Sequence, residues 1–99
     1  MVIEWLRFTV PVADQPRFIA QDAAVWTPTL AAHPGFAGKE VWCAANDPTA
    51  LNLIIRWDSM AQWQAVPPDI LAATDATFQA AMGAVYPVLD CIAYQVKGP

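Results

Sequence analysis

Few side chains in this sequence can carry chemistry. The 99 residues include one histidine, two cysteines and only five lysines and arginines, and the net charge is −4. Nucleic-acid binding is therefore not expected, because proteins that bind phosphates gather basic side chains on one surface. The single histidine and the widely spaced Cys43 and Cys91 cannot complete a zinc site within one chain, so no metal is expected either.

Features of membrane insertion and secretion are also absent. No apolar run reaches the roughly 18 residues that a membrane span requires. The first residues, MVIEWLRF, contain Glu4 and no basic region, so they do not read as a signal peptide. The scarcity of cations argues against binding to an anionic membrane surface. We therefore expect a cytoplasmic protein with reduced thiols and no membrane partner.

Apolar residues, by contrast, are abundant. They make up 57% of the chain, and charged residues make up 14%, against a usual charged share of about 25%. The length predicts one domain, residues 1–99. A domain this small buries only about 60–65% of its unfolded surface. Because one small monomer cannot hide this much apolar material, the composition predicts a partner surface.

The order of predicted elements is β-α-β-β-α-β. Strands are expected over 2–10, 36–45, 51–58 and 88–96, with helices over 14–33, 59–66 and 68–85. Pro28 should interrupt the first helix, since proline removes a backbone donor. The pattern predicts an α+β, ferredoxin-like fold with a four-stranded antiparallel sheet in spatial order 4-1-3-2 and helices on one face. Large apolar side chains alternate onto both faces of strands one and three, so the second face should pack against another copy in a homodimer.

Two stretches, WTPTLAAHPGFAGKEVW (26–42) and LIIRWDSMAQWQ (53–64), resemble the antibiotic biosynthesis monooxygenase superfamily. The marks are a Pro34-Gly35-Phe36 step into the second strand and Trp57-Asp58-Ser59 before a short helix with Trp63. The resemblance covers nearly the whole chain and implies a dimeric α+β barrel of eight strands. It implies a cofactor-independent oxygenase, or a related enzyme, acting on a small hydrophobic aromatic or quinone-like molecule. The pattern of the haem-degrading members is not matched, because strand one has no asparagine and the 69–85 helix has neither histidine nor tryptophan.

A second interpretation is a non-catalytic dimeric module that binds a small molecule or a partner. The sequence does not decide whether the protein is an enzyme, because it holds few titratable groups that could converge in a pocket. His33 is a candidate general base, since its ordinary pKa is near neutrality. Its simpler interpretation is a residue at a helix C-terminus, where the helix dipole favours a cation.

Aromatic residues are candidates for a ligand pocket, although such residues more often belong to a core. The candidates are Trp5, Trp26, Trp57, Trp63 and Phe78.

Three charged residues are predicted to share one sheet face. If a turn at 46–49 sets Ala44 opposite Asn52, then Glu40 lies opposite Arg56, and Glu4 lies close by on strand one. The even numbers of all three suggest a common face. Such a cluster would be a structural ion pair network, or a clamp for a ligand anion or carbonyl with Arg56 as the electrophile.

Overall fold

The computed structural model describes residues 1–99 and has the predicted α+β, ferredoxin-like order of elements. Its antiparallel sheet has the strand order β2-β3-β1-β4, as predicted. The strands are β1 (Val2–Thr9), β2 (Phe36–Ala44), β3 (Asp47–Trp57) and β4 (Asp90–Gln95). The helical segments are η1 (Val12–Asp14), α1 (Gln15–Gln21), η2 (Asp22–Trp26), α2 (Thr27–Ala31), α3 (Met60–Gln64) and α4 (Pro68–Met82).

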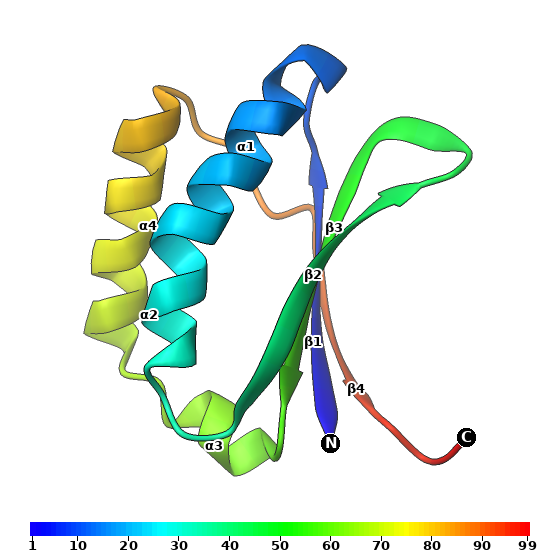
Figure 1. Ribbon diagram of the computed structural model, residues 1–99, viewed down its shortest axis with the longest axis vertical. Coiled ribbons are helices and arrows are strands. Elements are labelled where there is room, and N and C mark those ends of the chain that lie inside the picture. The colour runs from blue at the N-terminus through cyan, green and yellow to red at the C-terminus, as the bar shows by residue number, and fades with distance from the viewer.

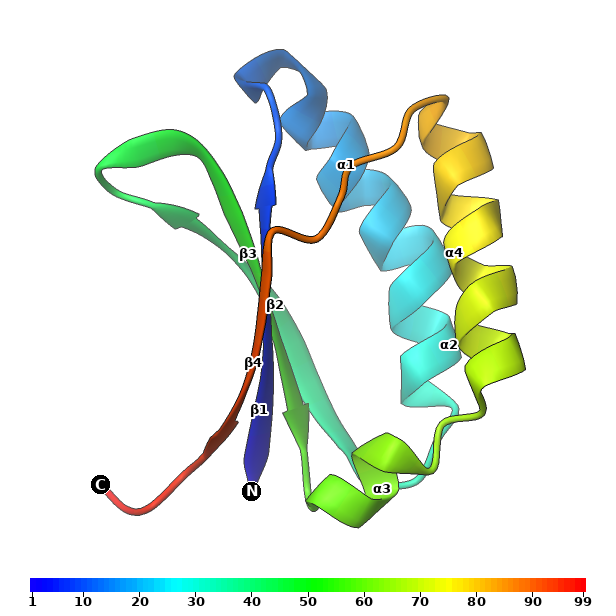
Figure 2. The ribbon, with the colours of Figure 1, turned by 180° about the vertical axis from the view of Figure 1, so that it is seen from behind.

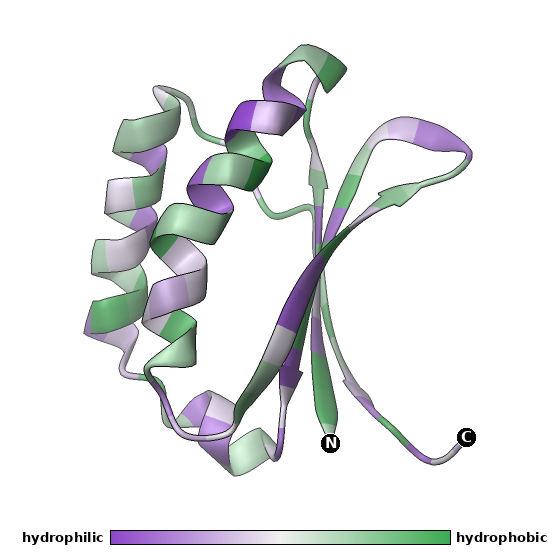
Figure 3. Ribbon diagram, in the orientation of Figure 1, coloured by the Kyte–Doolittle hydropathy of each residue, from purple (hydrophilic) through white to green (hydrophobic).

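The helices form a layer on one side of the sheet. Figures 1 and 2 show α1 and α2 running end to end on that face with α4 beside them, while the other face carries no helix. Figure 3 shows hydrophobic and hydrophilic segments alternating along α1 and α4, as expected for helices with one buried face. No helix combines the length and the apolar character that crossing a membrane would need.

The first long helix is interrupted, as the proline pattern predicts. Between α1 and α2 lies η2, a π-helical turn in which the Thr27 N–H donates to the Asp22 carbonyl five residues back. Pro28, at the start of α2, has no N–H and cannot continue the α-helical hydrogen bonds. The wider turn changes which residues face the sheet. Phe18, Asp22 and Leu30 are buried, whereas Ile19, which a regular helix would bury with Leu30, is 40% exposed.

Glycines and one serine define several element ends. Gly83 ends α4 with a φ of 68°, and the Ser59 hydroxyl caps α3 by accepting from the Gln62 N–H at 3.2 Å. Gly35 has a φ of 91°, and its carbonyl accepts from the Asp58 N–H at 2.7 Å. These contacts fix the step from α2 into β2 against the end of β3. Asp14, at the N-cap position of α1, makes no capping bond and instead accepts from the Tyr86 hydroxyl at 2.8 Å.

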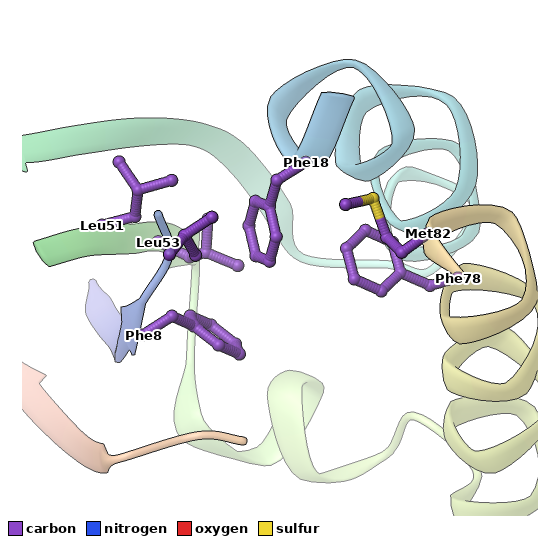
Figure 4. Packing of buried hydrophobic residues seen from close by; sticks show 7 residues of the cluster. Phe8, Phe18, Leu51, Leu53, Phe78 and Met82 are labelled. Atoms are coloured by element: carbon purple, nitrogen blue, oxygen red, sulfur yellow. The ribbon is translucent and has the colours of Figure 1, made fainter. Parts of the chain in front are cut away.

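The core between helices and sheet centres on Phe18. Its ring makes edge contacts with Phe8, Phe78 and Tyr86 at centroid distances of 5.4, 5.2 and 5.6 Å. Figure 4 shows Phe18 between the sheet residues and Phe78 with Met82 on α4. These aromatic contacts join α1, β1 and α4 at one end of the domain. A second buried cluster, Leu30, Ile55, Trp57 and Val66, lies nearer α3.

The helix-free face of the sheet exposes large apolar side chains. Trp42, Ile92 and Tyr94 are 49%, 36% and 50% exposed, and Trp5 stacks edge-on against Tyr94 at 6.4 Å. Every residue of β4 is exposed. This open face matches the second apolar face that the sequence predicts.

The predicted hairpin register is wrong by two residues. The turn is formed by Ala45 and Asn46, and Ala44 pairs with Asp47. The register then shifts between Ala44 and Cys43, so Glu40 pairs with Ile54 instead of Arg56. A shift of two preserves the face on which each side chain lies, because side chains alternate with period two. Glu40 and Arg56 therefore still share the open face.

Candidate functional site

A cavity of about 510 Å³ lies between the sheet and the helices. Twenty-two residues line it, and 16 of these are hydrophobic. Its volume suits a small organic ligand, since such pockets span about 300–1,000 Å³. Several exposed residues belong to the lining, among them Asp75 on α4 and Val85 and Val88 in the segment that leads into β4. The cavity therefore opens to solvent between α4 and that segment.

Four of the five predicted pocket aromatics line this cavity. Trp26, Trp57, Trp63 and Phe78 come from η2, β3, α3 and α4 respectively. The prediction is wrong for Trp5. Its position on β1 faces the open side of the sheet, where its indole N–H donates to Asn52 Oδ1 at 2.9 Å.

A buried ion pair interrupts the apolar lining. Lys39 on β2 binds Asp22 at the start of η2, and their side chains are only 5% and 2% exposed. Lys39 Nζ also lies 3.4 Å from Thr27 Oγ1. The other carboxylate oxygen, Asp22 Oδ1, is buried and has no hydrogen-bond partner. Burial lowers the pKa of Lys39 to about 8.

A β-bulge turns Lys39 toward the helices. The register shifts between Phe36 and Gly38, so Ala37 is an extra residue in β2. Phe36 packs on Trp57 on the helix side, and after the bulge Lys39 takes that side as the partner of Ile55. If β2 had no bulge, strict alternation from Phe36 would place Glu40 inside and Lys39 outside.

Glu4 lies on the same face, in the same row across the sheet. Ile55 pairs with Lys39 on one side and with Glu4 on the other. Two strand spacings separate their backbones, about 10 Å. Burial raises the pKa of Glu4, while the hydrogen bond from Trp57 Nε1, at 3.2 Å, opposes this rise. The floor of the cavity thus has one ionisable group at each end and an apolar residue between them.

This placement corrects the predicted charge cluster. Glu40 and Arg56 do form an ion pair on the open face, where their side chains are 50% and 30% exposed. A hydrogen bond from Trp42 Nε1, at 3.1 Å, and the Arg56 guanidinium lower the pKa of Glu40. Glu4 does not join them. It pairs with Ile55, so the even positions of β1 share a face with the odd positions of β3.

Neither candidate catalytic residue reaches the cavity. His33 follows α2 and lies outside the lining, in agreement with its simpler interpretation as a residue at a helix end. Arg56 borders only a shallow hollow on the open face, with Trp5, Trp42 and Tyr94. No group of three or more metal-ligating side chains comes together in the structure.

Sequence reasoning missed the Asp22–Lys39 pair. A signal was present, because Asp22 follows Phe18 by four residues and precedes Trp26 by four, which places a carboxylate in an apolar stripe. Its partner, Lys39, could not be predicted, because regular alternation along β2 from Phe36 points Lys39 away from the helices. Only the bulge at Ala37 turns it toward them.

No protein-family profile matches the sequence, and no curated protein matches it. Solved structures do match its fold. SnoaB, a cofactor-independent oxygenase from Streptomyces nogalater, is 18% identical over 99% of this chain and 94% of its own, with a TM-score of 0.67. A Bordetella bronchiseptica protein assigned as an antibiotic biosynthesis monooxygenase is 14% identical over 96% and 95%, with a TM-score of 0.74.

A third structure contains a ligand. It is a monooxygenase from the gene ActVA-Orf6 of Streptomyces coelicolor in complex with nanaomycin D, and it is 17% identical over 99% of this chain and 88% of its own, with a TM-score of 0.72. At sequence identities this low, the structural matches establish a shared fold and nothing finer. The resemblance predicted from the sequence is thus confirmed at that level: the chain has the ferredoxin-like fold of antibiotic biosynthesis monooxygenases.

Proposed function

We propose that the protein binds a small hydrophobic aromatic or quinone-like molecule between its sheet and helices and oxygenates it without a cofactor. The observation that carries this proposal is the cavity of about 510 Å³, which is lined by three tryptophans and also contains Glu4, Asp22 and Lys39. Apolar walls with a few buried polar groups are typical of small-molecule sites. Similar folds in SnoaB and in the nanaomycin D complex support the choice of reaction.

The chemistry requires only oxygen and an electron-rich ring. Anthrone is a suitable probe, because its CH₂ group and one O₂ give the carbonyl of anthraquinone and one water. One oxygen atom enters the product, and the ring supplies the electrons that reduce the other. The protein's part is to bind and orient the ring and to exclude bulk water.

The test is oxygen uptake with anthrone, followed by mass spectrometry of product formed under ¹⁸O₂. We expect uptake above the spontaneous rate and one labelled atom in anthraquinone. The cavity variant Trp57→Ala should lose the enhancement, whereas Asp69→Asn, an exposed position outside the lining, should keep it. Tight binding of anthrone without faster uptake would favour the non-catalytic alternative, which the absence of His33 and Arg56 from the cavity also favours.

We also propose that the protein acts as a homodimer, with the open sheet faces of two copies packed together. Trp42, Ile92 and Tyr94 support this, because a free antiparallel sheet normally presents polar side chains to water. Such an interface should bury on the order of 2,000 Å² in total. Sedimentation should give a dimer for the wild type and a monomer for Ile92→Asp. A wild-type monomer at micromolar concentration would contradict the dimer.

We propose that the protein is cytoplasmic. Cys43 and Cys91 are exposed free thiols, and unpaired thiols are typical of proteins in reducing compartments. A location in an oxidising compartment, shown by fractionation, would contradict this placement.

A further inference from the structure

The Asp22–Lys39 pair has hydrogen-bonding capacity that the protein itself does not use. A lysine ammonium has three donors, and Lys39 uses two, toward Asp22 Oδ2 and Thr27 Oγ1. Asp22 Oδ1 has no donor at all. Buried polar atoms are nearly always satisfied, so an unpaired carboxylate oxygen in a cavity wall calls for a partner.

The two unused hydrogen-bonding positions are an acceptor and a donor, and they lie on the two residues of the ion pair. One is an acceptor, Asp22 Oδ1, and the other is a donor, the third N–H of Lys39. Both residues line the cavity. The terminal torsion of an aspartate side chain is soft, so a small rotation presents Oδ1 to a ligand. A hydroxyl group fits both positions at once, because it donates one hydrogen bond and accepts others. An ether or a ketone oxygen can only accept.

We propose that Asp22 and Lys39 bind a hydroxyl group on the aromatic ring of the ligand. The hydroxyl donates to Asp22 Oδ1, its oxygen accepts from Lys39 Nζ, and the ring lies over Ile55 toward Trp57. This assignment rests on the proposed function and deepens it, because it selects hydroxylated rings over their ethers.

The test compares two ligands of similar shape, 1-naphthol and 1-methoxynaphthalene, by isothermal titration calorimetry with the full chain. We expect the wild type to bind 1-naphthol at least about tenfold more tightly, the effect of one hydrogen bond to a charged acceptor. In Asp22→Asn, the amide oxygen should turn to Lys39 and the NH₂ group to the ligand. The two affinities should then agree within about threefold. The control Asp69→Asn should keep the tenfold preference.

The outcomes separate the two proposals. Equal affinities in the wild type overturn the hydroxyl site and leave aromatic binding in the cavity intact. A preference that survives in Asp22→Asn also overturns it, because the extra methyl group alone would then explain the difference. If neither ligand binds and anthrone uptake is not accelerated, the hydroxyl site and the proposed function both fail. Should Asp22→Asn not fold, as judged by circular dichroism, the wild-type comparison still decides against the site if the affinities are equal.

Discussion

Replacing Lys39 with methionine should destabilise the fold severely. The substitution keeps the length of the side chain and removes its charge, so the carboxylate of Asp22, only 2% exposed, loses its charged partner. Breaking a buried ion pair by removing one partner costs about 3–5 kcal/mol. A domain of 99 residues has a total stability of about 5–15 kcal/mol, so the loss is a large share of it.

The assay is thermal unfolding followed by circular dichroism at one fixed protein concentration. Each kcal/mol shifts the Tm of a domain this size by about 4–8 °C. Lys39→Met should therefore melt at least about 12 °C below the wild type. The control is Lys97→Met, the same substitution at an exposed position outside every strand and helix, and it should change the Tm by no more than about 2–4 °C.

A double variant separates lost charge from lost packing. Asp22→Leu combined with Lys39→Met replaces the pair with apolar groups, and such replacements are often neutral or stabilising. It should recover most of the stability that Lys39→Met loses. If Lys39→Met melts within a few degrees of the wild type, Asp22 is not confined in an apolar wall. If the double variant is as unstable as the sum of the single variants, the two side chains are not coupled.

Three further predictions concern other sites. Glu4→Gln should be more stable than the wild type near pH 7 but not below pH 4, because burial raises the pKa of Glu4 above its ordinary 4.5 and the wild-type fold therefore loses stability as the pH rises through the raised pKa. Urea titrations across this pH range measure the difference in unfolding free energy between the two proteins, and a difference that does not change with pH would contradict the prediction. Gly35→Ala should cost about 1–3 kcal/mol in a thermal melt, since Gly35 has a φ of 91° and a β-carbon there would lie 2.6 Å from the Gln62 side chain; an unchanged Tm would show that the turn relaxes freely. Ser59→Ala should cost about 1 kcal/mol by the loss of its cap on Gln62, and Ser59→Asp, which can also cap, should restore it.

Local signals predicted the architecture well because each depends on only a few neighbouring residues. The Pro34-Gly35-Phe36 step, the short helix after Ser59 and the interruption near Pro28 follow from backbone sterics and hydrogen bonding. Relations between strands were predicted less well. Whether two residues on different strands share a face depends on the register of the strands. Even-numbered residues of β1 pair with odd-numbered residues of β3, whereas even-numbered residues of β2 from Gly38 to Trp42 pair with even-numbered residues of β3.

For the same reason the candidate site was only partly predicted. Aromatic residues were selected by residue type, and Trp26, Trp57, Trp63 and Phe78 do line the cavity, whereas Trp5 does not. The polar residues depend on the bulge at Ala37 and on the π-helical turn at Asp22, both of which change the period locally. Predictions that assume regular strand alternation and regular helical spacing therefore fail for side chains placed by a bulge and a π-helical turn.

The cavity also has a consequence for turnover in the cell. A ligand that binds in the cavity of the folded chain, and not to the unfolded chain, stabilises the fold by mass action. A ligand at 100 times its Kd would add about 2.7 kcal/mol. Because proteases act on the unfolded fraction, changes of that size alter abundance several-fold. Cells short of the ligand would then degrade this protein faster, and its steady-state level would report how much ligand is present.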